Sequence, residues 1–207
     1  MYTLYGAPGS GSAAVEFALE RTGAPFRLVR AASWEPDSAL DALQRLNPLK
    51  QVPTLELPDG SVMTESAAIL IYLGLAFPAS RLLPHPGSAC AQALRGLVFV
   101  AANCYAAIGV IDFPERWFAD ADDAAKESVQ RAARERLHLH WDLFADQFGA
   151  QLRSDDPGAL EVLAAVVSKW SGARAHLAAR RPTFRATLER IEQHPAVAAV
   201  FARHWPR

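Results

Sequence analysis

A chain of 207 residues is long enough to build one or two packed hydrophobic cores. Hydrophobic residues make up 51% of the chain and charged residues 21%, a composition that excludes intrinsic disorder and low-complexity sequence. The formal net charge is −1, and the arginines are interspersed with acidic residues. Because nucleic-acid binding requires clustered cations, we expect a folded protein with no nucleic-acid partner.

Three features of the sequence indicate the location of the protein and the redox state of its cysteines. Residues 1–5 lack a basic start and lead into a Gly/Pro turn, so we expect no targeting segment and a cytoplasmic location. The longest apolar run that we identify, residues 67–77, is shorter than the roughly 18 residues of a transmembrane helix, so we expect no membrane partner. Cys90 and Cys104 lie too far apart in one predicted helical stretch for a disulfide bond, and we expect both to be reduced.

Strand and helix signals alternate over the first eighty residues or so. Ser12 is predicted to be the N-cap of a first helix that ends at Gly23. The predicted strands are residues 2–5, 26–30, 52–57 and 61–64, and the other predicted helices are residues 39–46 and 65–77. The order strand-helix-strand-helix-strand-strand-helix is that of a thioredoxin-like α/β domain, which we assign to residues 1–77.

From about residue 88 onward the apolar periodicity is helical. Three prolines fall within residues 78–87, so we predict a linker over residues 78–88 and an all-α helical bundle over residues 89–207. The predicted helices of this bundle are residues 89–108, 123–148, 159–170, 182–193 and 196–204.

A glycine-rich turn joins the first predicted strand to the first predicted helix. Residues 9–14 read GSGSAA and match the dinucleotide-binding pattern G-x-G-x-x-A. A doubly wound nucleotide-binding domain needs more parallel strands than follow here, so we set that interpretation aside. The free N–H groups and the positive dipole end at this helix start still favour an anion beside residues 10–12, and the alternative is a plain serine-capped turn.

Two other segments bring polar groups to places that a ligand can reach. Val52-Pro53 stands where a strand should begin, and a cis bond there would leave the main chain of Val52 free to pair with an extended peptide. Glu65-Ser66 opens a helix, so a carboxylate, a hydroxyl and unpaired N–H groups meet at one point. Such a set can hold both ends of an amino acid. A trans strand start and plain helix capping are the alternatives.

The first-turn motif is Ala7-Pro8-Gly9-Ser10, the motif before the third strand is Gln51-Val52-Pro53-Thr54-Leu55, and the third helix begins with Thr64-Glu65-Ser66-Ala67-Ala68-Ile69. In these motifs and in its layout the whole chain resembles the cytosolic glutathione S-transferases, in particular bacterial members with a serine-type first turn. The resemblance implies a detoxifying transferase that conjugates glutathione to small hydrophobic electrophiles. It also implies a homodimer that uses glutathione as co-substrate and holds no tightly bound cofactor and no metal.

The resemblance implies a role for each motif. Glutathione would lie extended across the first domain, with its cysteinyl main chain paired to Val52 and its γ-glutamyl group held by Glu65 and Ser66. Gln51, together with Lys50, would face the glycyl end. The residues that would line the glutathione site are Gly11, Ser12, Lys50, Gln51, Val52, Pro53, Glu65 and Ser66.

Serine-type members place a hydroxyl beside the thiol, and Ser10 matches their Pro-Gly-Ser sequence. We therefore predict that Ser10 donates to the sulfur and favours the thiolate, which can attack an electrophilic carbon. Ser12 and Tyr5 are the alternatives in the same region. Cysteine-type members carry Cys where this chain has Gly11, so thiol exchange through an enzyme cysteine is disfavoured.

The helical half would wall a second-substrate pocket, for which we name Asn103, Tyr105, Phe113 and Trp117. The family has Ser or Thr three residues before Asp at the start of its central helix, where this chain has Gly158 and Glu161. Glycine caps nearly as well, and Glu161 can reach back to the N-cap N–H.

His138 and His140 stand two apart on a helix and face different directions, so we expect a solvated pair and no metal site. Two other functions fit the same fold. One is a glutathione-dependent peroxidase or disulfide reductase, and the other is a non-catalytic glutathione- or ligand-binding protein. The sequence leaves the electrophile open.

Overall fold

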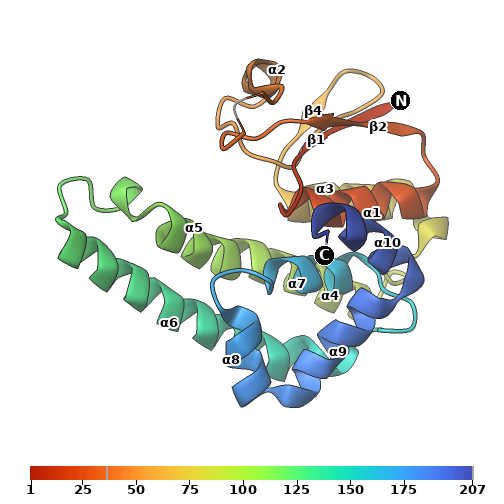
Figure 1. Ribbon diagram of the computed structural model, residues 1–207. Coiled ribbons are helices and arrows are strands. Elements are labelled where there is room, and N and C mark those ends of the chain that lie inside the picture. The colour runs from red at the N-terminus through yellow and green to blue at the C-terminus, as the bar shows by residue number, and fades with distance from the viewer. Residues whose placement is uncertain (36, 207) are drawn as a thin grey trace.

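The computed structural model describes residues 1–35 and 37–206, and a four-stranded mixed sheet forms its first domain (Figure 1). The strands are β1 (Tyr2–Gly6), β2 (Phe26–Arg30), β3 (Thr54–Glu56) and β4 (Val62–Met63), in the order β2-β1-β3-β4. β1 is parallel to β2 and antiparallel to β3, and β3 is antiparallel to β4. A parallel pair needs a crossover, which α1 (Ser12–Thr22) supplies. The element order is the predicted one.

Helices cover the two faces of this sheet differently. Successive residues of a strand point to opposite faces, so Leu4 and Tyr5 of β1 enter different cores. Leu4 joins the large core with residues of α1 and α3 (Ser66–Ala76). Tyr5 joins a small cluster with Ala31 and with Leu43 of α2 (Leu40–Leu46). The face that carries α1 and α3 is therefore the one that meets the helical half.

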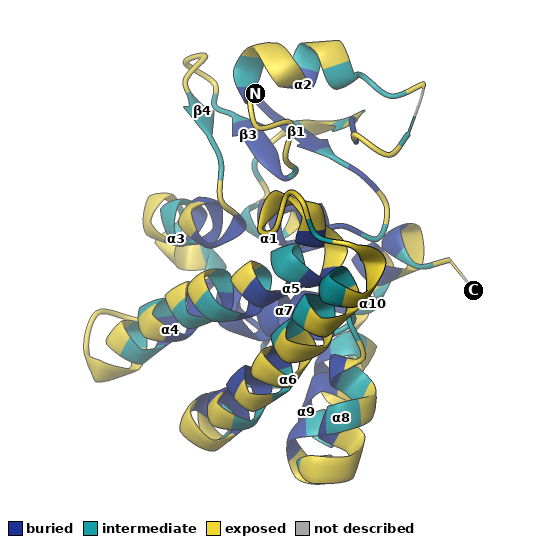
Figure 2. Ribbon diagram, turned by 90° about the vertical axis from the view of Figure 1, so that its left-hand side faces the viewer, coloured by how far each residue is buried: buried dark blue, intermediate teal, exposed yellow. Residues whose placement is uncertain are grey.

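The second half of the chain is helical, as predicted. α7 is buried along its whole length at the centre of the helical domain (Figure 2). The helices are α4 (Ser88–Phe99), α5 (Ala106–Asp112), α6 (Asp123–Phe148), α7 (Ala159–Val167), α8 (Ala173–Arg180), α9 (Pro182–Gln193) and α10 (Pro195–His204). A π-helical segment, η2 (Val100–Tyr105), and three short 3-10 turns, η1 (Pro78–Ser80), η3 (Pro114–Arg116) and η4 (Gly149–Gln151), complete the elements.

Helix α8 was not predicted, because its eight residues lie between Gly172 and Pro182 and span too few turns to show a clear period. Its presence corrects the interpretation of the α6 histidines. His138 stacks on His176 of α8 with ring centroids 4.3 Å apart, and His140 is buried with its Nδ1 3.1 Å from the Asn103 carbonyl oxygen. Burial lowers the pKa of both His138 and His140. The prediction of a solvated pair is therefore wrong.

The elements α4, η2 and α5 form one continuous helix of 25 residues, Ser88–Asp112. By length and composition alone this helix could cross a membrane, and core helices of globular proteins meet the same criterion. Here it packs against α6 and α7. Arg95 and Asn103 interrupt the apolar residues of this helix, so residues 67–77 remain the longer uninterrupted run and the expectation of no membrane partner stays a prediction.

Gly158 is the N-cap of α7, and Glu161 supports it as predicted. The Glu161 carboxylate accepts hydrogen bonds from the N–H groups of Gly158 at 2.9 Å and Arg153 at 3.0 Å. The Leu82 carbonyl accepts from the Ala159 N–H at 2.9 Å, which ties the segment after α3 to the start of the central helix. A Cβ on residue 158 would lie 2.6 Å from that carbonyl oxygen. Only glycine leaves room for this contact.

We predict that Gly158→Ala lowers the free energy of unfolding by about 2 kcal/mol, because the added methyl overpacks a backbone contact. The measurement is chemical denaturation followed by circular dichroism. Gly109→Ala in α5 is the matched control, since a Cβ there meets nothing within 4 Å. It should stabilise the helix by up to ~1 kcal/mol. Equal effects at the two positions would contradict the prediction.

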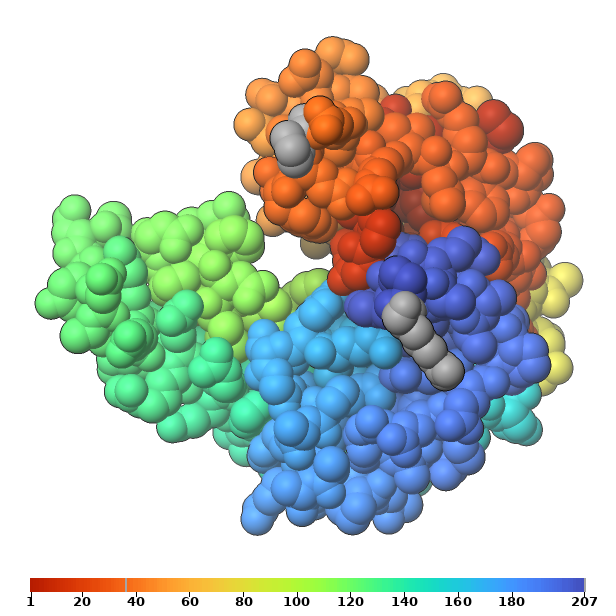
Figure 3. All heavy atoms as spheres, viewed as in Figure 1, coloured from red at the N-terminus to blue at the C-terminus, as the bar shows by residue number. Residues whose placement is uncertain are grey.

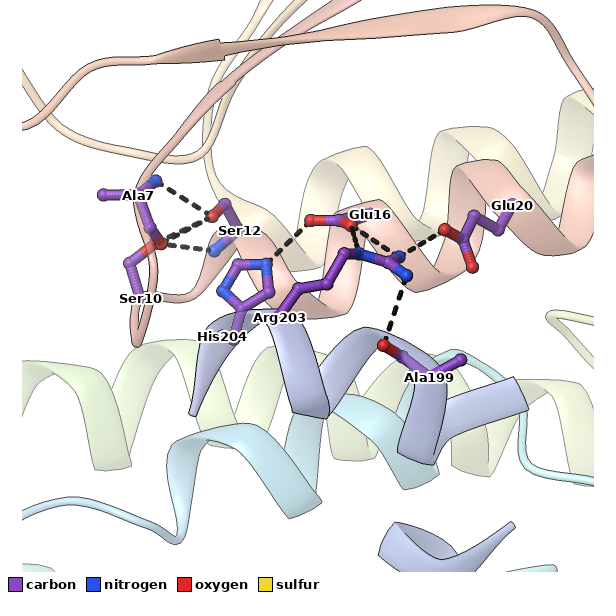
Figure 4. A network of polar contacts seen from close by, with 8 residues as sticks. All are labelled: Ala7, Ser10, Ser12, Glu16, Glu20, Ala199, Arg203 and His204. Atoms are coloured by element: carbon purple, nitrogen blue, oxygen red, sulfur yellow. Dashed lines mark hydrogen bonds and ion pairs between the residues drawn. The ribbon is translucent and has the colours of Figure 1, made fainter. Parts of the chain in front are cut away.

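The C-terminal helix α10 returns to the first domain and packs on α1. Glu16 of α1 is only 3% exposed, and its carboxylate lies 2.7 Å from His204 Nε2 and accepts from Arg203 Nε at 2.7 Å (Figure 4). Arg203 also pairs with the exposed Glu20. We call Glu16, Glu20, Arg203 and His204 the Glu16 cluster. It joins the two ends of the chain.

Candidate functional site

The first-turn loop between β1 and α1 is held by its own serines. Ser10 Oγ donates to the Ala7 carbonyl oxygen at 2.7 Å and lies 2.8 Å from Ser12 Oγ (Figure 4). The Ser12 N–H in turn donates to Ser10 Oγ at 3.2 Å. Gly11, not Ser12, is the N-cap of α1, so the predicted cap is wrong by one residue. The Ser10 and Ser12 hydroxyls are both buried and engaged within the loop.

Tyr5, the third candidate for a thiol partner, lies in β1. It is 7% exposed and packs with Ala31 and Leu43, on the α2 side of the sheet. This environment is that of a core aromatic.

Hydrogen bonds from two buried polar side chains, Asn47 and Thr54, fix the segment before β3. Neither was named as a site residue from the sequence. Asn47 Nδ2 donates to the Gln51 carbonyl oxygen and to Thr54 Oγ1, each at 3.1 Å, and Thr54 Oγ1 donates to the same carbonyl at 2.9 Å. The Val52-Pro53 bond is cis. Val52 precedes β3, whose ladder with β1 begins at Thr54, so its main chain lies outside the ladder.

Lys50 and Gln51 are exposed at the edge of this segment, Val52 is half-buried and Pro53 is buried. Lys50 has a positive φ of 54°, which turns the chain sharply before the β3 segment. The hydrogen bonds of Asn47 and Thr54 hold this turn in place. Their sequence signal was one polar residue before the motif and one within it, which did not distinguish them from surface residues.

Glu65 and Ser66 stand together at the start of α3. Glu65 is the N-cap residue, its side chain is exposed and makes no capping hydrogen bond, and its φ is +64°. Ser66 is the first residue of α3 and is 7% exposed. A non-glycine residue with positive φ is strained by roughly 1–3 kcal/mol, and such residues cluster at functional sites. The exposed Glu65 carboxylate and the start of α3 therefore lie together at a strained backbone position.

The starts of α1 and α3 and the β3 segment converge on Tyr105, which ends the π-helical segment η2. A Cβ built on Gly11 would lie 2.3 Å from the Tyr105 hydroxyl oxygen and 3.6 Å from Pro53 Cδ. Burial raises the pKa of Tyr105 above its ordinary value, while the neighbouring Ser66 hydroxyl lowers it. The structure therefore brings Gly11, Pro53, Ser66 and Tyr105 into one cluster.

The other predicted pocket residues are not brought to this cluster. Asn103 donates through Nδ2 to the Phe99 carbonyl oxygen at 3.1 Å within its own helix. Phe113 and Trp117, exposed by 40% and 65%, follow α5 and lie at the far end of the arm formed by α5 and α6 (Figure 1). The surface is hollowed between this arm and the first domain (Figure 3).

Within residues 1–35 and 37–206, no group of three or more His, Cys, Asp or Glu side chains could hold a metal ion. Cys90 and Cys104 are unpaired, as predicted. Burial raises the pKa of the Cys104 thiol to about 12, so this cysteine is not a nucleophile near neutral pH.

A family model described as the glutathione S-transferase N-terminal domain matches residues 12–76. A solved structure of a sphingomonad glutathione S-transferase complexed with glutathione matches 99% of this chain and 100% of its own, with a TM-score of 0.77 and 26% identity. Residues 12–76 therefore match the N-terminal domain of the glutathione S-transferases, and the whole chain has the fold of solved members of that family. A Sulfitobacter glutathione transferase homologue with bound glutathione matches with a TM-score of 0.77 and 25% identity, covering 97% of this chain and 96% of that one.

The glutathione S-transferase from Xylella fastidiosa has a TM-score of 0.79 and 25% identity, with 97% of each chain covered. Among curated relatives, the uncharacterised GST-like protein YncG of Escherichia coli K12 is 38% identical over 131 residues. The match spans 62% of this chain and 63% of YncG, so it covers less than two thirds of that relative.

The C-terminal helix α10 and Trp205 also contact the first-turn loop, a contact that no local sequence pattern indicates. A Cβ on Gly9 would lie 3.6 Å from Trp205 Nε1 and 3.8 Å from the His204 carbonyl oxygen. Gly9 has a φ of +72°, a conformation that favours glycine. The loop that carries Ser10 is therefore supported by the last helix of the chain.

Proposed function

We propose that this protein is a member of the glutathione S-transferase family, which binds glutathione across its first domain and transfers it to small hydrophobic electrophiles. The observation that carries the proposal is the convergence of Gly11, Pro53 and Ser66, which brings the starts of two helices to the main chain of Val52. The sphingomonad and Sulfitobacter relatives were both solved with glutathione.

Each group in the cluster has chemistry that suits one part of the tripeptide. The hydroxyl and N–H of Ser66 at a helix start suit a carboxylate, and the free carboxylate of Glu65 suits the adjacent ammonium. The main chain of Val52 suits the cysteinyl residue, and the exposed Lys50 and Gln51 suit the glycyl end. The sulfur would then lie beside Gly11 and Ser12 at the start of α1.

The proposed reaction is nucleophilic substitution or addition at carbon. The glutathione S–H loses its proton to solvent, and the positive end of α1 stabilises the thiolate. The sulfur forms a bond to the electrophilic carbon, and a leaving group departs with its electron pair or an alkene accepts a proton. Ser10 is the predicted thiol partner, but its proton is donated to Ala7 in the structure, so it would have to exchange that bond for one to sulfur.

Calorimetric titration with glutathione tests the proposal, with the peptide α-Glu-Cys-Gly as matched control. We expect at least tenfold weaker binding of the control, because its glutamyl ammonium and carboxylate cannot both reach Glu65 and Ser66. A panel of electrophiles then tests transfer through loss of free thiol. Equal affinity for the two tripeptides, or binding to neither, would overturn the proposal.

The same assay separates the alternative functions. With a peroxide or a disulfide added as oxidant, formation of oxidised glutathione would indicate a peroxidase or disulfide reductase, and binding without lowering of the thiol pKa would indicate a non-catalytic binder. We also propose, from the family resemblance, a cytoplasmic homodimer, which sedimentation equilibrium and cell fractionation would test.

A further inference from the structure

The Tyr105 hydroxyl is a buried polar atom that lacks a partner. It forms no hydrogen bond of normal geometry with any residue in the described ranges 1–35 and 37–206. The ring is held by Trp170, with the ring centroids 5.8 Å apart. A buried hydroxyl without a partner loses its hydrogen bonds to water, so such a group calls for an explanation.

The hydroxyl occupies the space that a side chain at residue 11 would fill. A Cβ on Gly11 would lie only 2.3 Å from the oxygen, which is closer than real atoms approach. Gly11 is the N-cap of α1, where the helix dipole favours a negative charge. The absence of a side chain at Gly11 therefore admits a hydroxyl from the other domain to the helix start.

The backbone of η2 places the hydroxyl there. Val100–Tyr105 is π-helical within an otherwise regular helix, and π-helical turns occur frequently at functional sites. Tyr105 is the last residue of this segment, so the extra residue per turn sets the direction from which its side chain leaves the helix.

We propose that Tyr105, from the helical domain, donates the hydrogen bond that stabilises the glutathione thiolate. The inference rests on the proposed function and adds the residue that contacts the sulfur. Ser10 and Ser12 are the alternatives, but their hydroxyls are bonded to Ala7 and to each other.

The raised pKa of Tyr105 is consistent with a phenol that donates a hydrogen bond. Burial raises its pKa most, the Ser66 hydroxyl lowers it by less, and the negative charge of Glu65 adds a smaller increase. The phenol therefore keeps its proton near neutral pH and donates it in a hydrogen bond. The proton of the thiol goes to solvent, so no proton is transferred to or from Tyr105.

Tyr105→Phe tests this assignment. The pKa of the bound thiol is measured from the ultraviolet absorbance of the thiolate as pH is varied, and kcat is measured with a reactive electrophile. We expect the bound thiol pKa to rise by about one unit and kcat at neutral pH to fall about tenfold, with recovery at higher pH. Glutathione affinity should change less than about threefold, since the γ-glutamyl contacts remain.

Two variants make the result specific. Tyr72→Phe in α3 removes a tyrosine hydroxyl away from the cluster and should leave the bound thiol pKa and kcat at wild-type values. Ser10→Ala should change the bound thiol pKa by less than Tyr105→Phe does. A shift with Ser10→Ala and none with Tyr105→Phe would overturn the proposal and assign the role to the first-turn serine.

Gly11→Ala gives an independent measurement, because the new methyl must displace the Tyr105 hydroxyl. Its effect on the bound thiol pKa should match that of Tyr105→Phe and should largely disappear in the Tyr105→Phe background. Additive effects would contradict the proposal. If the wild-type protein binds no glutathione, the proposed function fails; if it binds glutathione with a lowered thiol pKa that Tyr105→Phe leaves unchanged, only this inference fails.

Discussion

Glu65→Gln and Glu65→Gly should both weaken glutathione binding by roughly 10- to 100-fold, because each removes a charged hydrogen-bond partner for the ligand ammonium. Their effects on stability should differ. The positive φ of Glu65 strains any residue with a Cβ, and glycine relieves part of that strain. After subtraction of the extra freedom that glycine gives the unfolded chain, Glu65→Gly should raise the free energy of unfolding by about 1 kcal/mol.

The measurement pairs calorimetric titration with chemical denaturation for both variants. Glu115→Gln is the control, since Glu115 is an exposed acid in η3 at the far end of the arm and should change neither quantity. If Glu65→Gly is no more stable than Glu65→Gln, the backbone at this position is not strained. If both variants bind glutathione as the wild type does, Glu65 has no contact with the ligand.

Glu16→Gln should lower the free energy of unfolding by about 3 kcal/mol near neutral pH, because it removes one partner from a buried ion pair. The Glu16 carboxylate has almost no exposed surface and bonds to both Arg203 and His204. Glu20→Gln is the matched control, since it removes the other carboxylate of the Glu16 cluster from an exposed position. Its effect should stay below ~1 kcal/mol.

The stabilisation that Glu16 provides to the folded protein depends on pH, and the direction of its pKa shift sets the direction of this dependence. Burial alone would raise the pKa of Glu16, but the hydrogen bonds from His204 and Arg203 outweigh it and lower the pKa below the ordinary value of 4.5. A lowered pKa in the folded state stabilises the protein above pH 4.5 and less as the pH falls through the folded-state value.

Denaturation curves at a series of pH values therefore test the contribution of the buried Glu16 carboxylate and its contacts with Arg203 and His204. The difference between wild type and Glu16→Gln should be largest near neutral pH and should shrink in acid. The pKa of Asp156 is lowered by its hydrogen bond from Arg21 and by the charges of Arg21, Arg81 and Arg153, so it adds to the acid sensitivity of both proteins. A difference that stays constant down to strongly acid pH would contradict the assignment to Glu16.

Local patterns were sufficient to predict much of this fold. The bounds of β2, α6 and α9 agree with the sequence, because each carries a clear period between strong Gly, Pro or Asp signals. Strands β3 and β4 are shorter than predicted, since only the residues that pair in the ladder count as strand. The short helix α8 gave no such period, and its omission led to the wrong environment for His138.

Local sequence patterns were also sufficient to predict part of the candidate site. Glu65, Ser66 and Val52 could be named as candidates from the sequence, because a helix start and a strand start are local features. The position of the Tyr105 hydroxyl depends on how two domains pack, and its place opposite Gly11 has no signal in either segment alone. The contact of Glu16 with His204 joins residues 188 positions apart, which no local pattern indicates.

The return of α10 to α1 has a consequence for synthesis on the ribosome. Translation delivers Glu16 188 residues before His204, and Trp205 follows His204 directly. Until then the Glu16 carboxylate of the nascent first domain lacks its partners Arg203 and His204. The loop at Gly9 likewise lacks its contact with Trp205. The native shape of that loop should therefore be acquired only after the helical domain has been synthesised and α10 has packed on α1.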